Sequence, residues 1–207
     1  MQHYRPFILA RRGELSAISK LSPAARSAFT PVLVVPGRSW DFESDEYAKS
    51  LSEHFESFPK KYRDSLGSAV AFVDVSLLDS DESIFGGVDP LTWIVEESNV
   101  LGLELVPLVT PFSASSALGA VRKLHQKYGR GVGIRIAPEE WVSLDDTHLE
   151  RLLAATGLSP QDVDLFIDCG STFGPLVQRS LLTELAELDS RYLFRSARCQ
   201  AVWSHLG

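Results

Sequence analysis

The stretch Gly131–Ile136, with the sequence GVGIRI, is a short apolar run that carries one charged residue, Arg135, near its end. Two other apolar runs share this pattern, with Asp74 and Asp168 each standing late in the run between two apolar neighbours. Because side chains of a strand alternate between two faces, the apolar neighbours point to one face and the charged residue to the other. In an open sheet covered by helices both faces are apolar, whereas in a (β/α)₈ barrel the second face is the interior near the carboxyl-terminal mouth. The pattern therefore favours a barrel.

Six apolar runs alternate along the chain with longer stretches of helical spacing. The runs occupy residues 7–10, 30–36, 69–76, 103–109, 131–136 and 163–169. Regular alternation of strand and helix indicates a parallel sheet covered by helices. A dinucleotide-binding open sheet has no support, because no Gly-x-Gly-x-x-Gly motif follows the first run. The sequence thus predicts an α/β protein with a TIM-barrel-like fold of six βα units, incomplete at the C-terminus because a standard barrel has eight units.

The length of 207 residues suits one domain, so we expect residues 1–207 to form a single barrel-like domain. Residues 190–207 contain no evident seventh strand and are expected to be an irregular tail. One long helix is predicted from about residue 44 to residue 66, where leucine and aromatic side chains recur at intervals of three and four.

The composition narrows the class of partner and the compartment. The chain has 27 acidic and 20 basic side chains, a net charge of −7, which argues against a nucleic-acid binder because such proteins present a basic face. No run reaches the roughly 18 apolar residues that a membrane span needs, so no membrane contact is predicted. Two cysteines are too few for a disulfide-rich secreted scaffold. We expect a cytoplasmic protein.

The opening segment at residues 4–17, YRPFILARRGELSA, resembles the start of the phage-type Beta protein family. That family typically begins with a Tyr-x-Pro strand, a basic residue, Gly-Glu and a helix, and its members are proteins of bacteria, phages and satellite elements. Four later segments occur in the family's order: TPVLV at 30–34, VDV at 73–75, GIRI at 133–136 and DLFID at 164–168. The resemblance implies a TIM-barrel-like fold and a role in a phage-defence or immunity cassette of a mobile genetic element, with a protein partner from the same operon.

The charged residues at the predicted strand ends are the candidate site. Asp74 and Asp168 are the candidate catalytic residues, serving as acid and base across the barrel mouth. We expect both to point to one interior with Arg135, and Arg135 to lie within salt-bridge distance of at least one of them. Arg135 and Arg11 are candidates for binding an anion, since Arg11 and a second arginine stand at the start of a predicted helix, where free N–H groups and the helix dipole favour negative charge. Glu14 is a further ligand-binding candidate, although any carboxylate is favoured in a first helical turn.

The loop Gly170–Gly174, which follows the sixth run directly, contains Ser171. Such a loop can present backbone donors to a phosphate, or it can be a plain turn made of small residues. No metal site is predicted, because no histidine stands at a predicted strand end beside the two aspartates. The sequence identifies no cofactor.

Three functions fit these features. The first is a protein that acts through partner or small-ligand binding, and it predicts an exposed apolar patch. The second is an enzyme acting on an anionic small molecule, phosphorylated or carboxylated, and it requires Arg11, Asp74, Arg135 and Asp168 to converge on one open pocket. The third is a barrel without activity, in which these charges form structural ion pairs that are closed to solvent.

Overall fold

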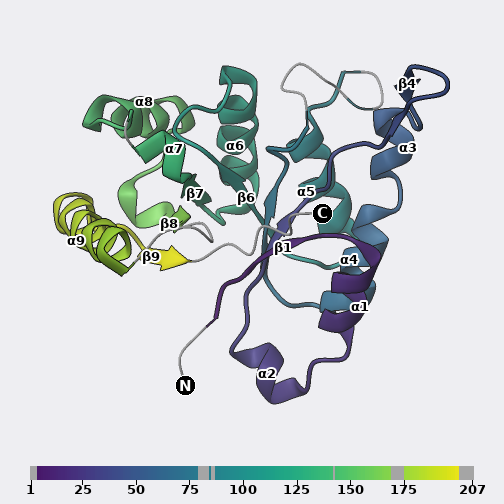
Figure 1. Cartoon of the computed structure of the whole chain (residues 1–207), viewed down its shortest axis with the longest axis horizontal. Coiled ribbons are helices and arrows are strands. Elements are labelled where there is room, and N and C mark those ends of the chain that lie inside the picture. Colours follow the sequence, from purple (N-terminus) through teal and green to yellow (C-terminus); the bar gives the residue numbers. More distant parts are fainter. Residues whose placement is uncertain (1–3, 79–83, 85–86, 142, 169–174, 201–207) are drawn as a thin grey trace. The chain divides into compact units, whose positions relative to one another are not determined.

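The protein is described from a computed structural model that covers residues 4–78, 84, 87–141, 143–168 and 175–200 (Figure 1). The chain forms two compact units, Met1–Val106 and Pro107–Gly207, here called unit 1 and unit 2. Each unit is built from parallel strands and the helices that connect them, and each is described by itself. None of the described helices is both long and apolar enough to cross a membrane.

Three parallel strands form the sheet of unit 1: β1 (Phe7–Leu9), β2 (Val32–Val34) and β5 (Ala71–Asp74). Their last residues lie side by side, because Leu9 pairs with Val34 and Val34 pairs with Asp74. The start of the next strand lies beside β5, where the Ala71 N–H donates to the Glu104 carbonyl at 3.2 Å. This register places Asp74 at the carboxyl edge of the sheet, where parallel sheets bind their ligands.

Three helices of unit 1 begin at residues whose side chains accept hydrogen bonds from free backbone N–H groups. Ser22, Ser50 and Asp89 accept these bonds at the starts of α2, α3 and α5. The helices are α1 (Arg12–Ser19), α2 (Pro23–Ser27), α3 (Leu51–Phe55), α4 (Phe58–Leu66) and α5 (Pro90–Val100). Helix α4 packs against both α1 and α5, and buried aromatic and aliphatic side chains fill these contacts.

The long helix predicted over residues 44–66 is wrong in its first part. Residues 46–47 form strand β4 (Glu46–Tyr47), which pairs in antiparallel fashion with β3 (Trp40–Asp41). Helix begins only after Ser50, whose hydroxyl accepts the Glu53 N–H while the Glu53 carboxylate accepts the Ser50 N–H. This reciprocal cap fixes the start of α3, so the apolar spacing before it does not propagate as helix.

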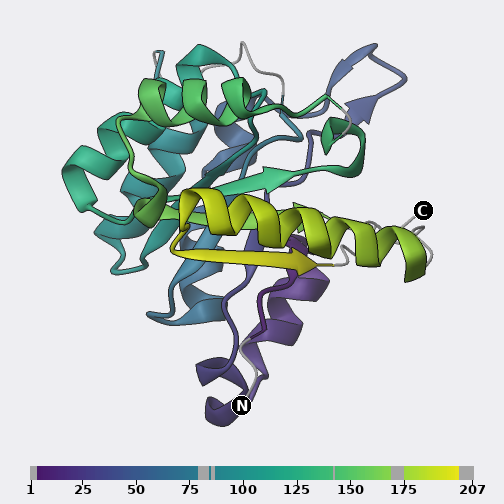
Figure 2. The same ribbon diagram turned by 90° about the vertical axis from the view of Figure 1, so that its left-hand side faces the viewer.

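Unit 2 contains the end of β6 (Leu105–Val109), together with β7 (Val132–Ile136), β8 (Val163–Asp168) and β9 (Ser196–Gln200), all parallel. Its helices are α6 (Ser115–Tyr128), α7 (Pro138–Trp141), α8 (Asp146–Thr156), the 3₁₀ turn η1 (Pro160–Asp162) and α9 (Pro175–Tyr192). Helix α6 packs against α8, and α9 runs along β9 (Figure 2). The sheet's apolar side chains, such as Ile134 and Leu165, are completely buried.

The α/β class and all six predicted strands are confirmed, and the described chain contains a seventh strand that the sequence did not predict. The described chain has seven parallel strands in the order β1-β2-β5-β6-β7-β8-β9, with β1 and β9 at the two ends of that order. The seventh strand, β9, lies within residues 190–207, where we expected an irregular tail. Its sequence, SARCQ, has no apolar run, so only its pairing with β8 reveals it as a strand. A TIM barrel closes eight strands into a ring, and that closure is not confirmed.

Candidate functional site

The predicted ion pair between Arg135 and an aspartate is confirmed. Arg135 Nη2 donates to Asp168 Oδ2 at 2.8 Å. Arg135 pairs in register with Phe166, and Asp168 lies two residues further along β8, so both charged side chains point to the same face of the sheet. The Asp168 side chain is 6% exposed and that of Arg135 is 20% exposed. A solute can therefore reach the arginine at the carboxyl edge of the sheet, while the carboxylate lies beneath it.

A second ion pair on the same face was not predicted. Asp164 Oδ2 accepts from Arg195 Nε at 3.0 Å and from Nη2 of the same guanidinium, and Asp164 Oδ1 accepts from Ser196 Oγ at 2.5 Å. The Asp164 side chain is 5% exposed and that of Arg195 is 38% exposed. Asp164 and Asp168 stand four residues apart in DLFID, the spacing that puts two strand residues on one face, and this was the available signal.

Asp74 lies in the other unit, at the end of β5. It is 1% exposed, and its Oδ1 accepts the Ser76 N–H at 2.8 Å. A carboxylate that accepts a backbone bond two residues on stabilises the turn after its strand. Arg135 and Asp168 belong to unit 2, so the expected convergence of the three charges stays a prediction.

Arg11 and Glu14 lie at the start of α1, as predicted. Arg11 is the exposed residue before the helix, and its carbonyl accepts the Leu15 N–H at 3.0 Å. Glu14 is half-buried in the first turn. Arg11 follows β1 by two residues, so the register brings it to the same edge of unit 1 as Asp74. Ser171 lies outside the described residues. The ligand-binding roles of these residues remain predictions.

Among the residues that the structure describes, no three His, Cys, Asp or Glu side chains gather closely enough to bind a metal ion.

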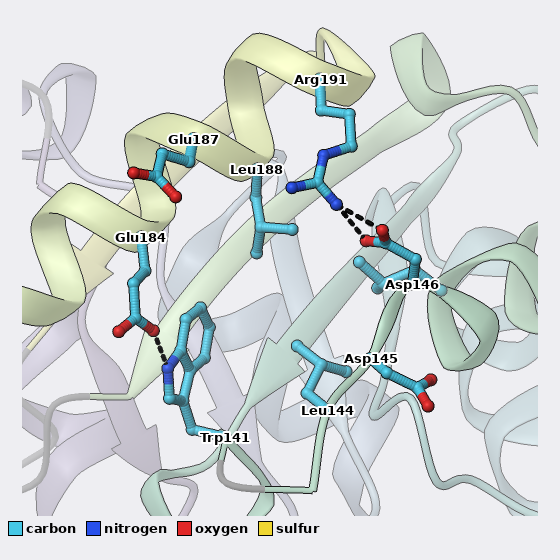
Figure 3. Close-up of a pocket in the computed structure, with 9 residues that line it drawn as sticks. Trp141, Leu144, Asp145, Asp146, Glu184, Glu187, Leu188 and Arg191 are labelled. Atoms are coloured by element: carbon cyan, nitrogen blue, oxygen red, sulfur yellow. Dashed lines mark hydrogen bonds and ion pairs between the residues drawn. The ribbon is translucent and has the colours of Figure 1, made fainter.

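Unit 2 also contains a pocket that the sequence did not reveal. It lies between the segment around α7 and the start of α8 on one side and α9 on the other, with a volume of about 200 Å³ (Figure 3). Its apolar lining consists of the Trp141 ring and three leucines, Leu144, Leu149 and Leu188. The remaining lining residues are charged: Asp145, Asp146, Glu184, Glu187 and Arg191. The lining residues come from two segments, 141–149 and 184–191, which are about forty positions apart, so only the packing of α9 brings them together.

Two of the four carboxylates in this pocket have partners within it. The Asp146 carboxylate forms an ion pair with Arg191, and the Glu184 carboxylate accepts a hydrogen bond from the indole N–H of Trp141 (Figure 3). Glu187 is exposed and makes no ion pair with any other residue that the structure describes. Four carboxylates against one guanidinium give the lining a net charge of −3.

Hydrogen bonds and neighbouring charges confirm that this surface is negative. The Thr147 hydroxyl, which donates to Asp145 Oδ1 at 2.5 Å, is the largest cause that holds the pKa of Asp145 below its ordinary value. The His148 side chain and N–H lower it further, so Asp145 is ionised at neutral pH. Next to the pocket, burial raises the pKa of Tyr192, and the negative charges of Asp146 and Glu150 raise it further.

The comparison with protein families gives one result. The chain matches the model of the family described as Beta protein over residues 4–201, which is nearly all of its length. No curated protein matches the sequence. The resemblance seen in the opening segment and in the order of the strands is thereby confirmed, and this chain belongs to the Beta protein family.

Proposed function

We propose that this Beta-family chain acts by binding, and that the pocket beside α9 receives a positively charged group of its ligand. The observation that carries the proposal is the pocket's net charge of −3 around an indole ring. An indole is the best aromatic partner for a cation, and carboxylates around it add charge attraction and hydrogen-bond acceptors.

The size of the pocket indicates what kind of cation it takes. Pockets for drug-sized ligands have volumes of about 300–1,000 Å³. A volume near 200 Å³ suits one guanidinium or alkylammonium group with part of its aliphatic stem. The three leucines provide apolar contact for that stem. The class of ligand is therefore a basic side chain, presented by a protein partner.

The setting of this binding is part of the proposal. We propose that the chain acts in the cytoplasm, in a phage-defence or immunity cassette of a mobile genetic element, with a protein partner from the same operon. Under the proposal, that partner presents an arginine or lysine to the pocket. The charge of the pocket supports the binding mode.

The pocket is tested with two small probes that differ mainly in charge. Nα-acetyl-arginine methyl ester should shift the NMR signal of the Trp141 indole N–H, whereas Nα-acetyl-citrulline methyl ester, which carries no charge, should not. Glu187→Gln should weaken binding of the arginine ester about twofold to fivefold, the range for one exposed charge pair. Glu97→Gln, on the exposed face of α5, is the matched control and should leave binding unchanged. Equal shifts with both esters would rule out the proposal.

A second candidate is an enzyme that acts on an anionic small molecule, and the Arg135–Asp168 pair favours it. The pair lies at the carboxyl end of β7 and β8, where parallel sheets bind ligands. In this proposal Arg135 binds a phosphate or carboxylate, and Asp168 is the catalytic acid or base. The test is a titration with inorganic phosphate: saturable changes in the backbone signals of β7 that disappear in the double variant Arg135→Met, Asp168→Leu support it, and their absence in the parent rejects it.

A further inference from the structure

We infer that the hairpin Trp40–Tyr47, called here the aromatic hairpin, is a docking element for a basic, apolar surface of a protein partner. The hairpin belongs to unit 1 and shares no residue with the pocket in unit 2. This inference is therefore independent of the proposed function.

The aromatic hairpin exposes large apolar side chains. Phe42, in the turn between β3 and β4, is 88% exposed, and Trp40 and Tyr47 are also exposed. Trp and Tyr are enriched among the residues that dominate binding at protein interfaces. Single exposed apolar residues are common, but three aromatic rings within eight residues of one small hairpin form a patch.

The hairpin is also ordered before any partner arrives. Trp40 and Tyr47 pair directly across the two strands, with ring centroids 5.0 Å apart and an edge-to-face angle of 83°. The Arg38 guanidinium lies 3.6 Å from the centroid of the Tyr47 ring. The Ala48 N–H donates to the Ser39 carbonyl at 3.0 Å, which closes the base of the hairpin. A two-stranded hairpin alone is marginal in water, so these contacts reduce the entropy that binding would otherwise cost.

The charge of the hairpin indicates what kind of partner it binds. The eight residues Trp40–Tyr47 include four acidic and no basic side chains. The acidic residues are Asp41, Glu43, Asp45 and Glu46. Nucleic-acid phosphates and anionic lipids would be repelled by these charges, as would the same hairpin of a second copy. A protein surface that surrounds an apolar cleft with arginine and lysine complements both the rings and the carboxylates.

The inference is tested with a nine-residue peptide of alternating arginine and leucine, and with a matched peptide in which glutamate replaces arginine. The basic peptide should shift the indole N–H signal of Trp40, and the acidic peptide should not. Phe42→Ser should weaken binding of the basic peptide at least tenfold. Val100→Ser is the matched control, because Val100 is an apolar residue of unit 1 that is 78% exposed, and it should leave the affinity within a factor of two.

Binding at the pocket is followed separately through the Trp141 indole N–H signal, so it is not counted as binding at the hairpin. Phe42 is exposed, and an unchanged thermal unfolding curve of Phe42→Ser shows that the fold is intact. Equal binding of the two peptides, or equal affinity of Phe42→Ser and the parent, would overturn the inference. Self-association that Phe42→Ser abolishes would also overturn it, because the occupant would then be a second copy of the chain.

Discussion

Strand β8 carries two nearly buried aspartates on one face, Asp164 near its start and Asp168 at its end, and their arginine partners differ. Arg195, the partner of Asp164, is more than one third exposed and also donates to the Arg130 carbonyl at 3.1 Å. Arg135, the partner of Asp168, lies on the neighbouring strand and is about half as exposed. The two carboxylates are thus equally shielded, while water reaches the two cations to different extents.

The difference in exposure between the two arginines indicates what each ion pair does. The Asp164 pair joins β8 to the start of β9, since both Arg195 and Ser196 donate to it. Strand β9 has no apolar run, so this charged contact substitutes for the hydrophobic pattern that usually fixes a strand. The Asp168 pair joins two central strands that already have apolar neighbours, and it lies at the edge where ligands bind. The first pair is structural, and the second is the better candidate for function.

The largest effect is expected from removing Arg135. Arg135→Met leaves the Asp168 carboxylate buried without its cation, and breaking a buried pair in this way lowers the free energy of unfolding by about 3–5 kcal/mol. Urea unfolding measures the loss. Arg135→Lys, which keeps the charge, should lose less, and adding Asp168→Leu to Arg135→Met should recover most of the stability. A loss below about 1 kcal/mol for Arg135→Met would show that water already solvates Asp168.

The next largest effect concerns the backbone around Arg195. Gly131 has a φ of +77°, and a Cβ there would lie 2.1 Å from the Asp162 carbonyl oxygen and 3.0 Å from Arg195 Nη1. Gly131→Ala should therefore lower the free energy of unfolding by about 2–4 kcal/mol, through backbone strain and overpacking. Gly129→Ala is the control: Gly129 also has a positive φ, of +66°, but nothing lies within 4 Å of its Cβ position. Equal losses in the two variants, in the same urea experiment, would contradict the role of close packing near Arg195.

A smaller effect is expected from Asp164→Ala. The Arg195 left behind is exposed enough for water to solvate it, so the loss should be about 1–2 kcal/mol, less than for Arg135→Met. Amide hydrogen exchange should locate the loss in β9 rather than in β7. A loss as large as that of Arg135→Met would remove the distinction between the two pairs.

The smallest effect depends on pH. The pKa of Asp162 lies below its ordinary value of 3.8, chiefly because the Ser159 hydroxyl donates to its carboxylate, with further lowering by the charges of His125 and Arg195. A carboxylate with a lowered pKa stabilises the fold above its ordinary value, and this stability is lost as the pH falls from 3.8 through the lowered pKa.

Asp162→Asn should reduce the difference in stability between pH 5 and pH 2.5 by less than about 1 kcal/mol, since Asp162 is only half-buried and water screens its charge. Chemical unfolding at the two pH values measures this difference. The control is Asp41→Asn in the aromatic hairpin. It also removes a carboxylate with a lowered pKa, but at a position far along the sequence from Arg195. If the stability of Asp162→Asn depended more strongly on pH than that of the parent, the direction assigned to the pKa shift of Asp162 would be contradicted.

The sequence by itself determined the α/β class, the six apolar strands and the ion pair of Arg135. Alternation along a strand is a local property, so Arg135 and Asp168 between apolar neighbours had to share the face opposite the apolar one. The family was likewise recognisable from short segments and their order.

Tertiary structure alone decided β9, the Asp164–Arg195 pair and the pocket beside α9. Strand β9 forms by pairing with β8, and the pocket forms because α9 packs beside α7 and α8. In each case the partners lie about thirty or forty residues apart, and no periodicity within either segment records the contact. Local sequence patterns determine which face of a helix or strand is apolar. The polar contacts of β9 and α9 depend instead on which elements fold against each other.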